Sequence, residues 1–287
     1  MCLFLLAVVV AYEVAPGLVI ELQLEMQQRG RSGLFEAGGG GATPRRPALM
    51  PEAEPDVGPG GILFQVTEPK PENSHGTAFK VGGGTLWLTA NHVVDRCDTV
   101  GLDMGLLFAS AVTRGDSIPQ ADIAAIYLPA HVPQSLELAS SPPQPGDAGY
   151  HMGFPQGRRA VVISRYMGEA QVAIGHRGRS PVLMWVQVQR IPDFRGTLAG
   201  ISGGPVLNRH GALVGVNIAV SERRGRVLTA PPAAIASLLV AEDAVTFSTA
   251  SGQAAQPEEL NPITARYLVR ALDRAGTLRR VFCEVGK

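Results

Sequence analysis

The sequence predicts an all-β protein, and three observations lead to this prediction. Between residues 61 and 232, about a dozen short apolar or alternating segments follow one another, a pattern typical of β-strands. The chain has 34 glycines and 22 prolines among its 287 residues, which supply the turns that many short strands need. No long helical pattern separates the segments, so we expect antiparallel barrels or a sandwich and not a βαβ sheet.

Each expected strand is an apolar or alternating segment bounded by turn residues. In chain order, the expected strands cover residues 62–68, 77–81, 85–90, 106–112, 122–128, 149–154, 160–166, 170–174, 182–189, 204–208, 212–220 and 226–230. The composition, 45% apolar and 17% charged, provides enough apolar side chains for the core of one large or two small domains.

Two helices are expected after the strands. The segment 231–244 begins with two prolines and carries apolar residues at Ile235, Leu238 and Leu239. The segment 261–276 has a cap at Asn261, a proline in its first turn and a glycine after its end. We therefore expect a folded domain over residues 61–245, followed by a tail over 246–287 that contains the second helix.

The first 60 residues differ in composition from the rest of the chain. Residues 1–28 hold an apolar run from Cys2 to Tyr12 that is too short to cross a bilayer but fits the core of a signal peptide. No Lys or Arg precedes this run, so a signal or anchor and an ordinary docked helix both remain open. Residues 29–60 have the Gly-rich and Pro-rich composition of a linker. Export to the periplasm or membrane anchoring through the N-terminal segment is slightly favoured over a cytoplasmic location.

Charge and cysteine content argue against several classes of function. Lys plus Arg and Asp plus Glu both number 25, so the net charge gives no support for a nucleic-acid partner. Cys2, Cys97 and Cys283 form no CxxC pair and the histidines are scattered, so we expect no metal and no cofactor. A disulfide between Cys97 and Cys283 is compatible with the sequence but is not indicated by it. We expect His75 to face solvent.

The segment GISGGPVLNRHGALVGVN, residues 200–217, places one serine, Ser202, among glycines. A serine hydroxyl is a useful nucleophile only when a neighbouring base, usually a histidine, removes its proton. His92 is our candidate, because it follows the strand-like segment GTLWLTA, which would deliver it into a short turn. A carboxylate must then orient the imidazole, and our choice is Asp122, at the start of the segment DIAAIYL. The other carboxylates considered are Asp95, Asp103 and Asp116.

Several ordered segments between about residue 61 and residue 241 resemble the trypsin-like serine peptidases, most closely the bacterial Deg/HtrA-type branch. HGTAFKVGGGTLWLTANHVV is similar to the family's segment that ends in the histidine motif, and DIAAIYL is similar to its aspartate strand. LELASSPPQPGDAGYHMGFPQG resembles the segment that crosses to the second barrel. GISGGPVLNRHGALVGVN resembles the nucleophile loop and the hairpin after it, and VLTAPPAAIASLL the final strand and helix.

The resemblance implies a chymotrypsin-like fold of two antiparallel Greek-key β-barrels, roughly over residues 61–135 and 145–232. It also implies a serine endopeptidase that cleaves a polypeptide substrate through an acyl-serine intermediate. The triad would consist of His92, Asp122 and Ser202.

The glycines around the serine have roles in the family that the resemblance carries to this chain. The N–H groups of Gly200 and Ser202 would form the oxyanion hole. Gly203 and Gly204 would let the substrate approach closely. Pro205 would fix the exit from the loop into a strand.

The specificity pocket is expected to take a small or apolar P1 side chain. By resemblance, Gly196 would lie at its floor, and the wall would be formed by Ile218, Ala219 and Val220. Asp193, three residues before Gly196, keeps a basic preference open.

Two departures from the family pattern concern activation and recruitment. Ile201 stands before the serine, where digestive relatives carry an aspartate that pairs with a newly cut N-terminal amine, so that activation route is not expected. Only about 46 residues follow Ala241, so we expect no C-terminal PDZ module.

Two hypotheses from different classes of function remain. The first is an active endopeptidase that binds extended peptide segments along the second barrel. The second is a catalytically silent trypsin-like module that binds extended peptides and lacks a formed oxyanion hole. Ile201 and the unusual segment FRGTLAG favour the second hypothesis, and the presence of His92, Asp122 and Ser202 favours the first.

Overall fold

The computed structural model describes residues 53–58, 61–67, 72–82, 84–105, 110–129, 135–221, 224–242 and 259–286. The expected signal or anchor segment, 1–28, lies outside these ranges, as does the expected linker up to residue 52 and the first part of the strand expected over 106–112. None of the helices in these ranges has both the length and the apolar character needed to span a membrane.

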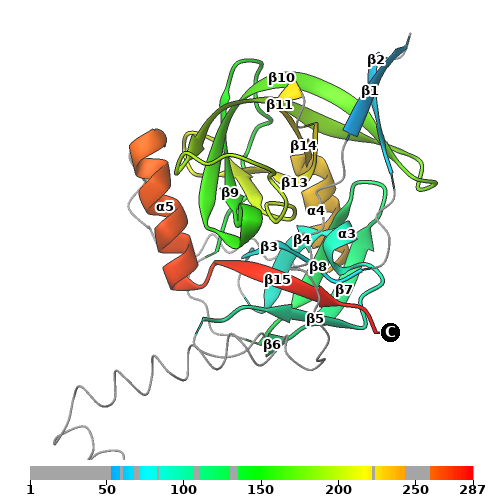
Figure 1. Ribbon diagram of the computed structural model, residues 1–287, viewed down its shortest axis with the longest axis vertical. Helices are drawn as coiled ribbons and strands as arrows, with labels where there is room; N and C mark the ends of the chain where they lie inside the picture. Colours follow the sequence, from blue (N-terminus) through cyan, green and yellow to red (C-terminus); the bar gives the residue numbers. More distant parts are fainter. Residues whose placement is uncertain are drawn as a thin grey trace, which may run out of the picture. The chain divides into compact units, whose positions relative to one another are not determined.

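One sheet contains eight strands in the order β1-β2-β10-β11-β14-β13-β12-β9 (Figure 1). A further pairing between β10 and β9 closes the six strands β9 to β14 into a barrel. The bounds of the eight strands are Ala53–Gly58 (β1), Gly61–Val66 (β2), Ala148–Gly153 (β9), Ala160–Ile174 (β10), Arg179–Ile191 (β11), Pro205–Leu207 (β12), Leu213–Ser221 (β13) and Arg226–Ala230 (β14).

The other sheet contains seven strands in the order β6-β5-β15-β3-β4-β8-β7 and forms a half-barrel. Its strands are Ser74–Lys80 (β3), Leu86–Ala90 (β4), Thr99–Leu102 (β5), Ser110–Ala111 (β6), Thr113–Ile118 (β7), Ile123–Tyr127 (β8) and Leu278–Glu284 (β15). Every pairing in this sheet is antiparallel. The prediction of an all-β protein with two antiparallel barrels is thus confirmed.

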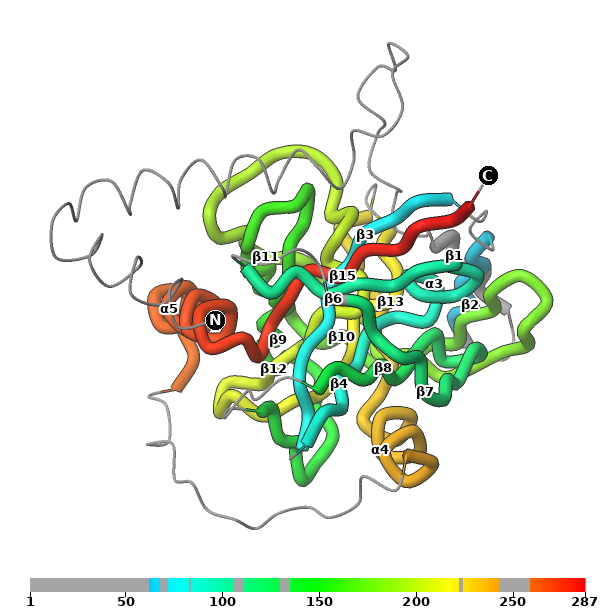
Figure 2. Tube along the Cα trace, turned by 90° about the horizontal axis from the view of Figure 1, so that it is seen from below, coloured from blue at the N-terminus to red at the C-terminus, as the bar shows by residue number. Residues whose placement is uncertain are grey.

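Near each end of the described chain, a strand joins a sheet to which the sequence did not assign it. β15 lies between β3 and β5, with Phe282 opposite both His75 and Gly101, and both views show it beside β3 (Figure 2). β2 runs parallel to the end of β10, with Leu63 opposite Gln171. The tail expected over 246–287 therefore completes the first sheet, and the strand expected at 62–68 belongs to the second.

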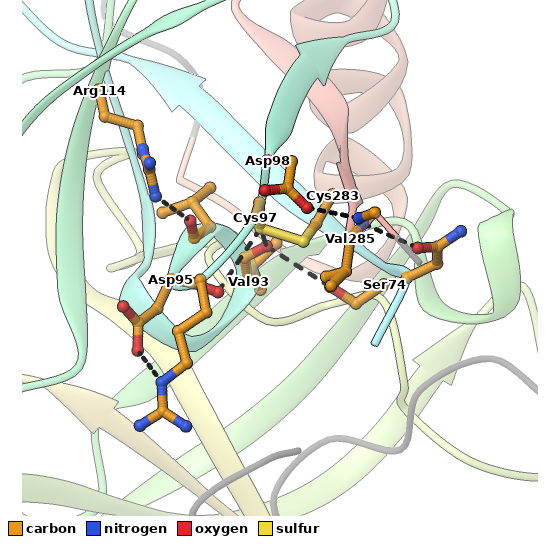
Figure 3. The surroundings of a disulfide bond; sticks show 12 residues. Ser74, Val93, Asp95, Cys97, Asp98, Arg114, Cys283 and Val285 are labelled. Atoms are coloured by element: carbon orange, nitrogen blue, oxygen red, sulfur yellow. Dashed lines mark hydrogen bonds and ion pairs between the residues drawn. A yellow bond between two sulfur atoms is a disulfide. The ribbon is translucent and has the colours of Figure 1, made fainter. Parts of the chain in front are cut away.

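A disulfide joins the C-terminal strand to the first sheet. Cys97 and Cys283 are bonded across 186 residues of sequence, with their Cα atoms 5.4 Å apart. Figure 3 shows this bond between the segment after a short helix and strand β15, close to the Ser74 hydroxyl, which donates to the Val93 carbonyl. The pairing that the sequence left open is present in the structure.

The two sheets share one apolar core, which fixes them relative to each other. Side chains from the first sheet, such as Phe79 and Ile123, belong to the same buried cluster as Met152 and Val216 from the second. Helix α4 (Pro232–Ala241) adds Ile235 and Leu238, as its apolar spacing predicts, and α5 (Pro262–Ala275) adds Val269 and Leu272. The cap at Asn261 and the left-handed Gly276 bound α5 as expected from the sequence.

Candidate active site

His92 lies in a single helical turn at the end of a buried strand. All five residues of β4 are buried, and the turn α3 (Asn91–Val94) follows them directly. Val93 and Val94 anchor this turn in the protein interior, while the imidazole of His92 retains 10% exposure. As expected from the sequence, a strand leads directly into the short turn that carries His92.

Asp122 holds both the imidazole and the main chain of this turn. Its Oδ2 lies 2.6 Å from His92 Nδ1, and its Oδ1 accepts a hydrogen bond from His92 N–H at 2.8 Å. Its carbonyl oxygen accepts a third bond, from Asn91 N–H at 2.9 Å. The residue is 2% exposed and has a φ of +55°, a left-handed conformation that Asp and Asn adopt more readily than most residues. Since the carboxylate accepts, Nδ1 carries the proton and Nε2 is left as the basic nitrogen.

The turn that carries Ser202 packs against strand β3 beside the histidine helix. The carbonyl of Ser202 accepts a hydrogen bond from Thr77 N–H at 2.8 Å. Gly76 has no room for a side chain, because a Cβ there would lie 2.8 Å from Val93 and 2.9 Å from the Ser202 carbonyl oxygen. Val93 directly follows His92, so the serine turn and the histidine helix meet at Gly76.

The hydroxyl of Ser202 is enclosed and lacks a hydrogen bond. The residue is 2% exposed, and its Oγ has no partner among the residues that the structure describes. The structure therefore contains the contact between His92 and Asp122 but not a hydrogen bond between His92 and Ser202. Of the three residues selected from the sequence, two are directly bonded, and the third lies on a turn that approaches Gly76 of β3, as α3 does.

Gly203 and Gly204 permit close packing of the chain against itself. A Cβ on Gly203 would lie 2.3 Å from the Thr77 carbonyl oxygen, and one on Gly204 would lie 2.1 Å from the Met152 carbonyl oxygen. From the sequence, we expect these glycines to allow close approach of the substrate. In the structure, the atoms that would clash with a side chain include backbone atoms of β3, β4 and β9.

Residues 198–201 form a tight turn before the serine, which we call the oxyanion turn. Ile201 N–H donates to the Leu198 carbonyl at 3.0 Å, and Gly200 has a φ of +98°, the left-handed value that the third position of a type II turn requires. Neither Gly200 N–H nor Ser202 N–H donates a hydrogen bond within the described part of the chain, so both can serve a ligand.

Gln156 sets the orientation of this turn. Its main-chain N–H donates to the Ala199 carbonyl at 2.7 Å. In the trans peptide between Ala199 and Gly200, this C=O and the Gly200 N–H point in opposite directions. Gly200 N–H therefore points away from Gln156. The Gln156 side chain is exposed, and its amide donates to the carbonyls of Arg195 at 2.9 Å and Thr197 at 3.0 Å. The residue itself is left-handed, with a φ of +54°. Sequence reasoning did not identify Gln156, because no motif marks it.

The residues discussed for the specificity pocket lie in two different environments. Ile218, Ala219 and Val220 on β13 are at most 2% exposed. Gly196 lies at the exposed surface with its carbonyl bonded to Arg190 Nη1 at 2.7 Å. Asp193 is also exposed. The three β13 side chains are thus part of the apolar interior, and the two loop residues face solvent.

Two further residues near the site have environments that the sequence did not indicate. Ile201 is fully buried in an apolar cluster with Val206 and Trp185. His75, expected in solvent, has a buried Nε2, and burial together with the nearby Arg280 lowers its pKa. His75 is one of the groups that exclude a side chain at Gly200, where a Cβ would lie 3.1 Å from its Nε2. The described residues contain no cluster of His, Cys, Asp and Glu that could hold a metal ion.

Residues 76–216 match the family model of the trypsin-like peptidase domain. This match begins at Gly76 in strand β3 and ends at Val216 in β13, so it includes His92, Asp122 and Ser202. The chain therefore carries a trypsin-like peptidase domain, as the resemblance of its motifs implied. No match among curated protein sequences was found.

Solved structures similar to this chain include proteases of the HtrA type. The HtrA-type protease AlgW with a decapeptide is 19% identical, with a TM-score of 0.49, and the match covers 58% of this chain and 51% of AlgW. The active form of the Rv3671c protease from M. tuberculosis is 19% identical, with a TM-score of 0.48 and coverage of 71% and 93%. The MamO protease domain from Magnetospirillum magneticum is 21% identical, with a TM-score of 0.46 and coverage of 60% and 91%.

Proposed function

We propose that the chain is a serine endopeptidase with Ser202 as nucleophile, His92 as general base and Asp122 as the residue that orients His92. The observation that carries this proposal is the double contact of the Asp122 carboxylate with His92, which leaves Nε2 as the only basic nitrogen of the imidazole. A purely structural contact between Asp122 and His92 gives no reason for the 10% exposure that the His92 side chain keeps.

The reaction would proceed through an acyl-serine. His92 Nε2 takes the proton of the Ser202 hydroxyl as Oγ attacks the substrate carbonyl, which requires a hydrogen bond that the unliganded structure lacks. The N–H groups of Gly200 and Ser202 receive the resulting oxyanion. The protonated His92 then gives its proton to the leaving amine, and a water molecule activated by the same nitrogen releases the acyl group.

An extended peptide is the substrate class that the strands support. Ala219 and Val220 of β13 pair with β14 on one side, after an irregularity at Ile218, and none of the strands that the structure describes pairs with these two residues on the other side. Such an edge can accept a substrate as an added strand. A small or apolar P1 side chain is part of this proposal, because Ile218, Ala219 and Val220 of β13 are all apolar.

The second candidate is a silent peptide-binding module. The buried Ser202 hydroxyl, which has no hydrogen bond among the described residues, is the observation that favours it. The orientation of Gly200 N–H away from Gln156 favours the enzyme, because a module without catalysis has no need of two N–H groups, those of Gly200 and Ser202, that have no acceptor among the described residues.

A fluorophosphonate probe separates the two candidates. The enzyme should form one covalent adduct, mapped by mass spectrometry to Ser202, and should cleave an unfolded protein substrate. Ser202→Ala should bind peptide but neither react with the probe nor cleave. If the folded wild-type chain, with its circular dichroism spectrum intact, is not labelled between mildly acidic and mildly basic pH, the peptidase proposal is wrong.

A further inference from the structure

His151 is a fully buried histidine that the proposed reaction does not use. It lies in the middle of β9 with 0% exposure. Its Nδ1 lies 2.6 Å from Asn217 Oδ1 on β13, and its Nε2 lies 2.6 Å from Ser164 Oγ on β10. The edge of the Trp185 indole from β11 packs against the imidazole at a centroid distance of 5.5 Å. Both ring nitrogens are therefore bonded inside the closed barrel.

The hydrogen bonds determine which nitrogen of His151 carries the proton. Asn217 Nδ2 donates to the Gly204 carbonyl at 3.0 Å, so Asn217 presents its oxygen, an acceptor, to His151. Nδ1 must then carry the proton. Nε2 accepts a bond from the Ser164 hydroxyl, whose Oγ lies 2.6 Å from Nε2 and 3.4 Å from its other acceptor, the Gly149 carbonyl oxygen. The imidazole is neutral, and every polar atom along this path from Ser164 to Gly204 has a partner.

This path ends on the turn that carries the serine. The Gly204 carbonyl accepts two bonds from Asn217, one from the side chain and one from the main-chain N–H at 2.9 Å. Gly203 N–H donates in return to the Asn217 carbonyl at 2.8 Å, and Gly204 N–H closes the turn on Ile201 at 2.9 Å. Gly203 and Gly204, the two residues that follow Ser202, are thus both hydrogen-bonded to Asn217.

We propose that His151 is a positioning residue for Ser202: by donating Nδ1–H to Asn217, it fixes the side chain that holds the backbone directly after the nucleophile. This inference rests on the proposed peptidase function and identifies a residue that acts through the backbone and does not touch the substrate. A displacement of the Ser202 backbone by a fraction of an ångström would misplace both its Oγ and its N–H, and rates are sensitive to such shifts.

The surroundings of His151 keep it in the required neutral form. Burial lowers its pKa to about 4, against a smaller opposite effect of the Asn217 hydrogen bond. Asn217, Ser164 and Trp185 face it from the adjacent strands, and none of them carries a charge. Tyr166, a titratable residue, packs against Trp185 at a centroid distance of 5.0 Å, and burial raises the pKa of that phenol. The imidazole therefore stays neutral at neutral pH, with Nδ1–H bonded to Asn217.

The test compares three variants with the wild type in steady-state hydrolysis, with rates normalised to active sites titrated by the fluorophosphonate probe. His151→Phe removes both hydrogen bonds at similar size, and His151→Gln can still donate to Asn217. His176→Ala, in the exposed turn between β10 and β11, is the control. We expect kcat per titrated site to fall roughly tenfold to a hundredfold in His151→Phe with KM within about twofold, and to recover in part in His151→Gln. The control should match the wild type.

Several outcomes would overturn the inference. A kcat per titrated site in His151→Phe within twofold of the wild type would show that His151 serves stability alone, while the peptidase proposal stands. If His151→Phe does not fold, Ser164→Ala and His151→Gln decide instead: kcat should fall in both, less than tenfold, and equality with the wild type in both rejects the inference. A wild-type chain that the probe does not label removes the peptidase proposal and this inference together.

Discussion

The carboxylate of Asp122 binds His92 through both of its oxygens, one on the imidazole Nδ1 and one on the main-chain N–H. The second bond ties the carboxylate to the backbone of α3, so the acid cannot move away from the ring without also losing its hydrogen bond to this backbone. The left-handed φ of Asp122 makes this double contact reachable from the start of β8.

Asp122→Asn should abolish most of the activity without unfolding the protein. Asn tolerates the left-handed backbone and its amide oxygen can still accept from His92 N–H, but its NH₂ group would face Nδ1 and force the proton onto Nε2. His92 would then present N–H where the reaction needs a base, and we expect kcat to fall about 10⁴-fold with little change in KM. Steady-state hydrolysis by protein of known active-site concentration measures kcat and KM. A thermal unfolding midpoint close to that of the wild type is the control, and a loss of less than tenfold would contradict the assigned role.

Replacing Gln156 should weaken the oxyanion turn. Gln156→Gly keeps the left-handed backbone and its bond to Ala199 but removes the two side-chain bonds to the carbonyls of Arg195 and Thr197. Because the amide is exposed and water competes with it, we expect kcat to fall roughly tenfold, less than the hundredfold to thousandfold typical of losing an oxyanion donor. A peptide aldehyde, which mimics the tetrahedral intermediate, should lose affinity in parallel, while KM stays constant. Gln144→Ala, another exposed glutamine, should behave like the wild type, and an unchanged aldehyde affinity in Gln156→Gly would reject the role.

The elements predicted from sequence are those whose signals are local. The caps of α5 and the short apolar runs of β3, β4 and β8 depend on neighbouring residues, so the sequence alone predicts them. The pairing of His92 with Asp122 followed from their positions at the end of one strand and the start of another. Residues 160–166 and 170–174 were expected as two strands and form the single strand β10, because Met167 to Glu169 continue the ladder across a bulge.

The features missed are those that depend on contacts distant in sequence. β15 carries two arginines and no clear alternation, and only its place between β3 and β5 makes it a strand. β7 is mostly exposed, so its sequence lacks an apolar pattern. His151 and Gln156 are of residue types that occur in any environment, and their importance arises from partners on other strands and loops.

The stability of the protein should decrease as the pH falls from about 6.5 to about 4. The pKa of His151 is lowered by burial to about 4 in the folded state, and a histidine in the unfolded chain titrates near 6.5. Within this window the unfolded chain binds more protons than the folded protein, so acid favours unfolding, and the full effect is about 3 kcal/mol. The lowered pKa of His75 acts in the same direction. Urea unfolding at pH 7 and pH 4.5 measures this change in the free energy of unfolding. His151→Gln should lose about 2 kcal/mol less than the wild type between these two pH values, and an equal loss in both proteins would show that other groups dominate.

The C-terminal strand should be necessary for the active site, although it contributes no residue to the proposed triad. A chain that ends at Thr277 lacks β15, which exposes the facing edges of β3 and β5 and removes Cys283, the partner of Cys97 five residues after His92. We expect this variant to lose the fold of the first sheet and all reaction with the fluorophosphonate probe, whereas a chain that ends at Glu284 keeps the strand and should be labelled normally. The double variant Cys97→Ser, Cys283→Ser separates the bond from the strand: it should remain folded and labelled, but with unfolding free energy lower by about 2 to 5 kcal/mol. Circular dichroism, urea unfolding and labelling of the three variants test this, and normal labelling of the chain that ends at Thr277 would mean that β3 and β5 hold the histidine turn without β15.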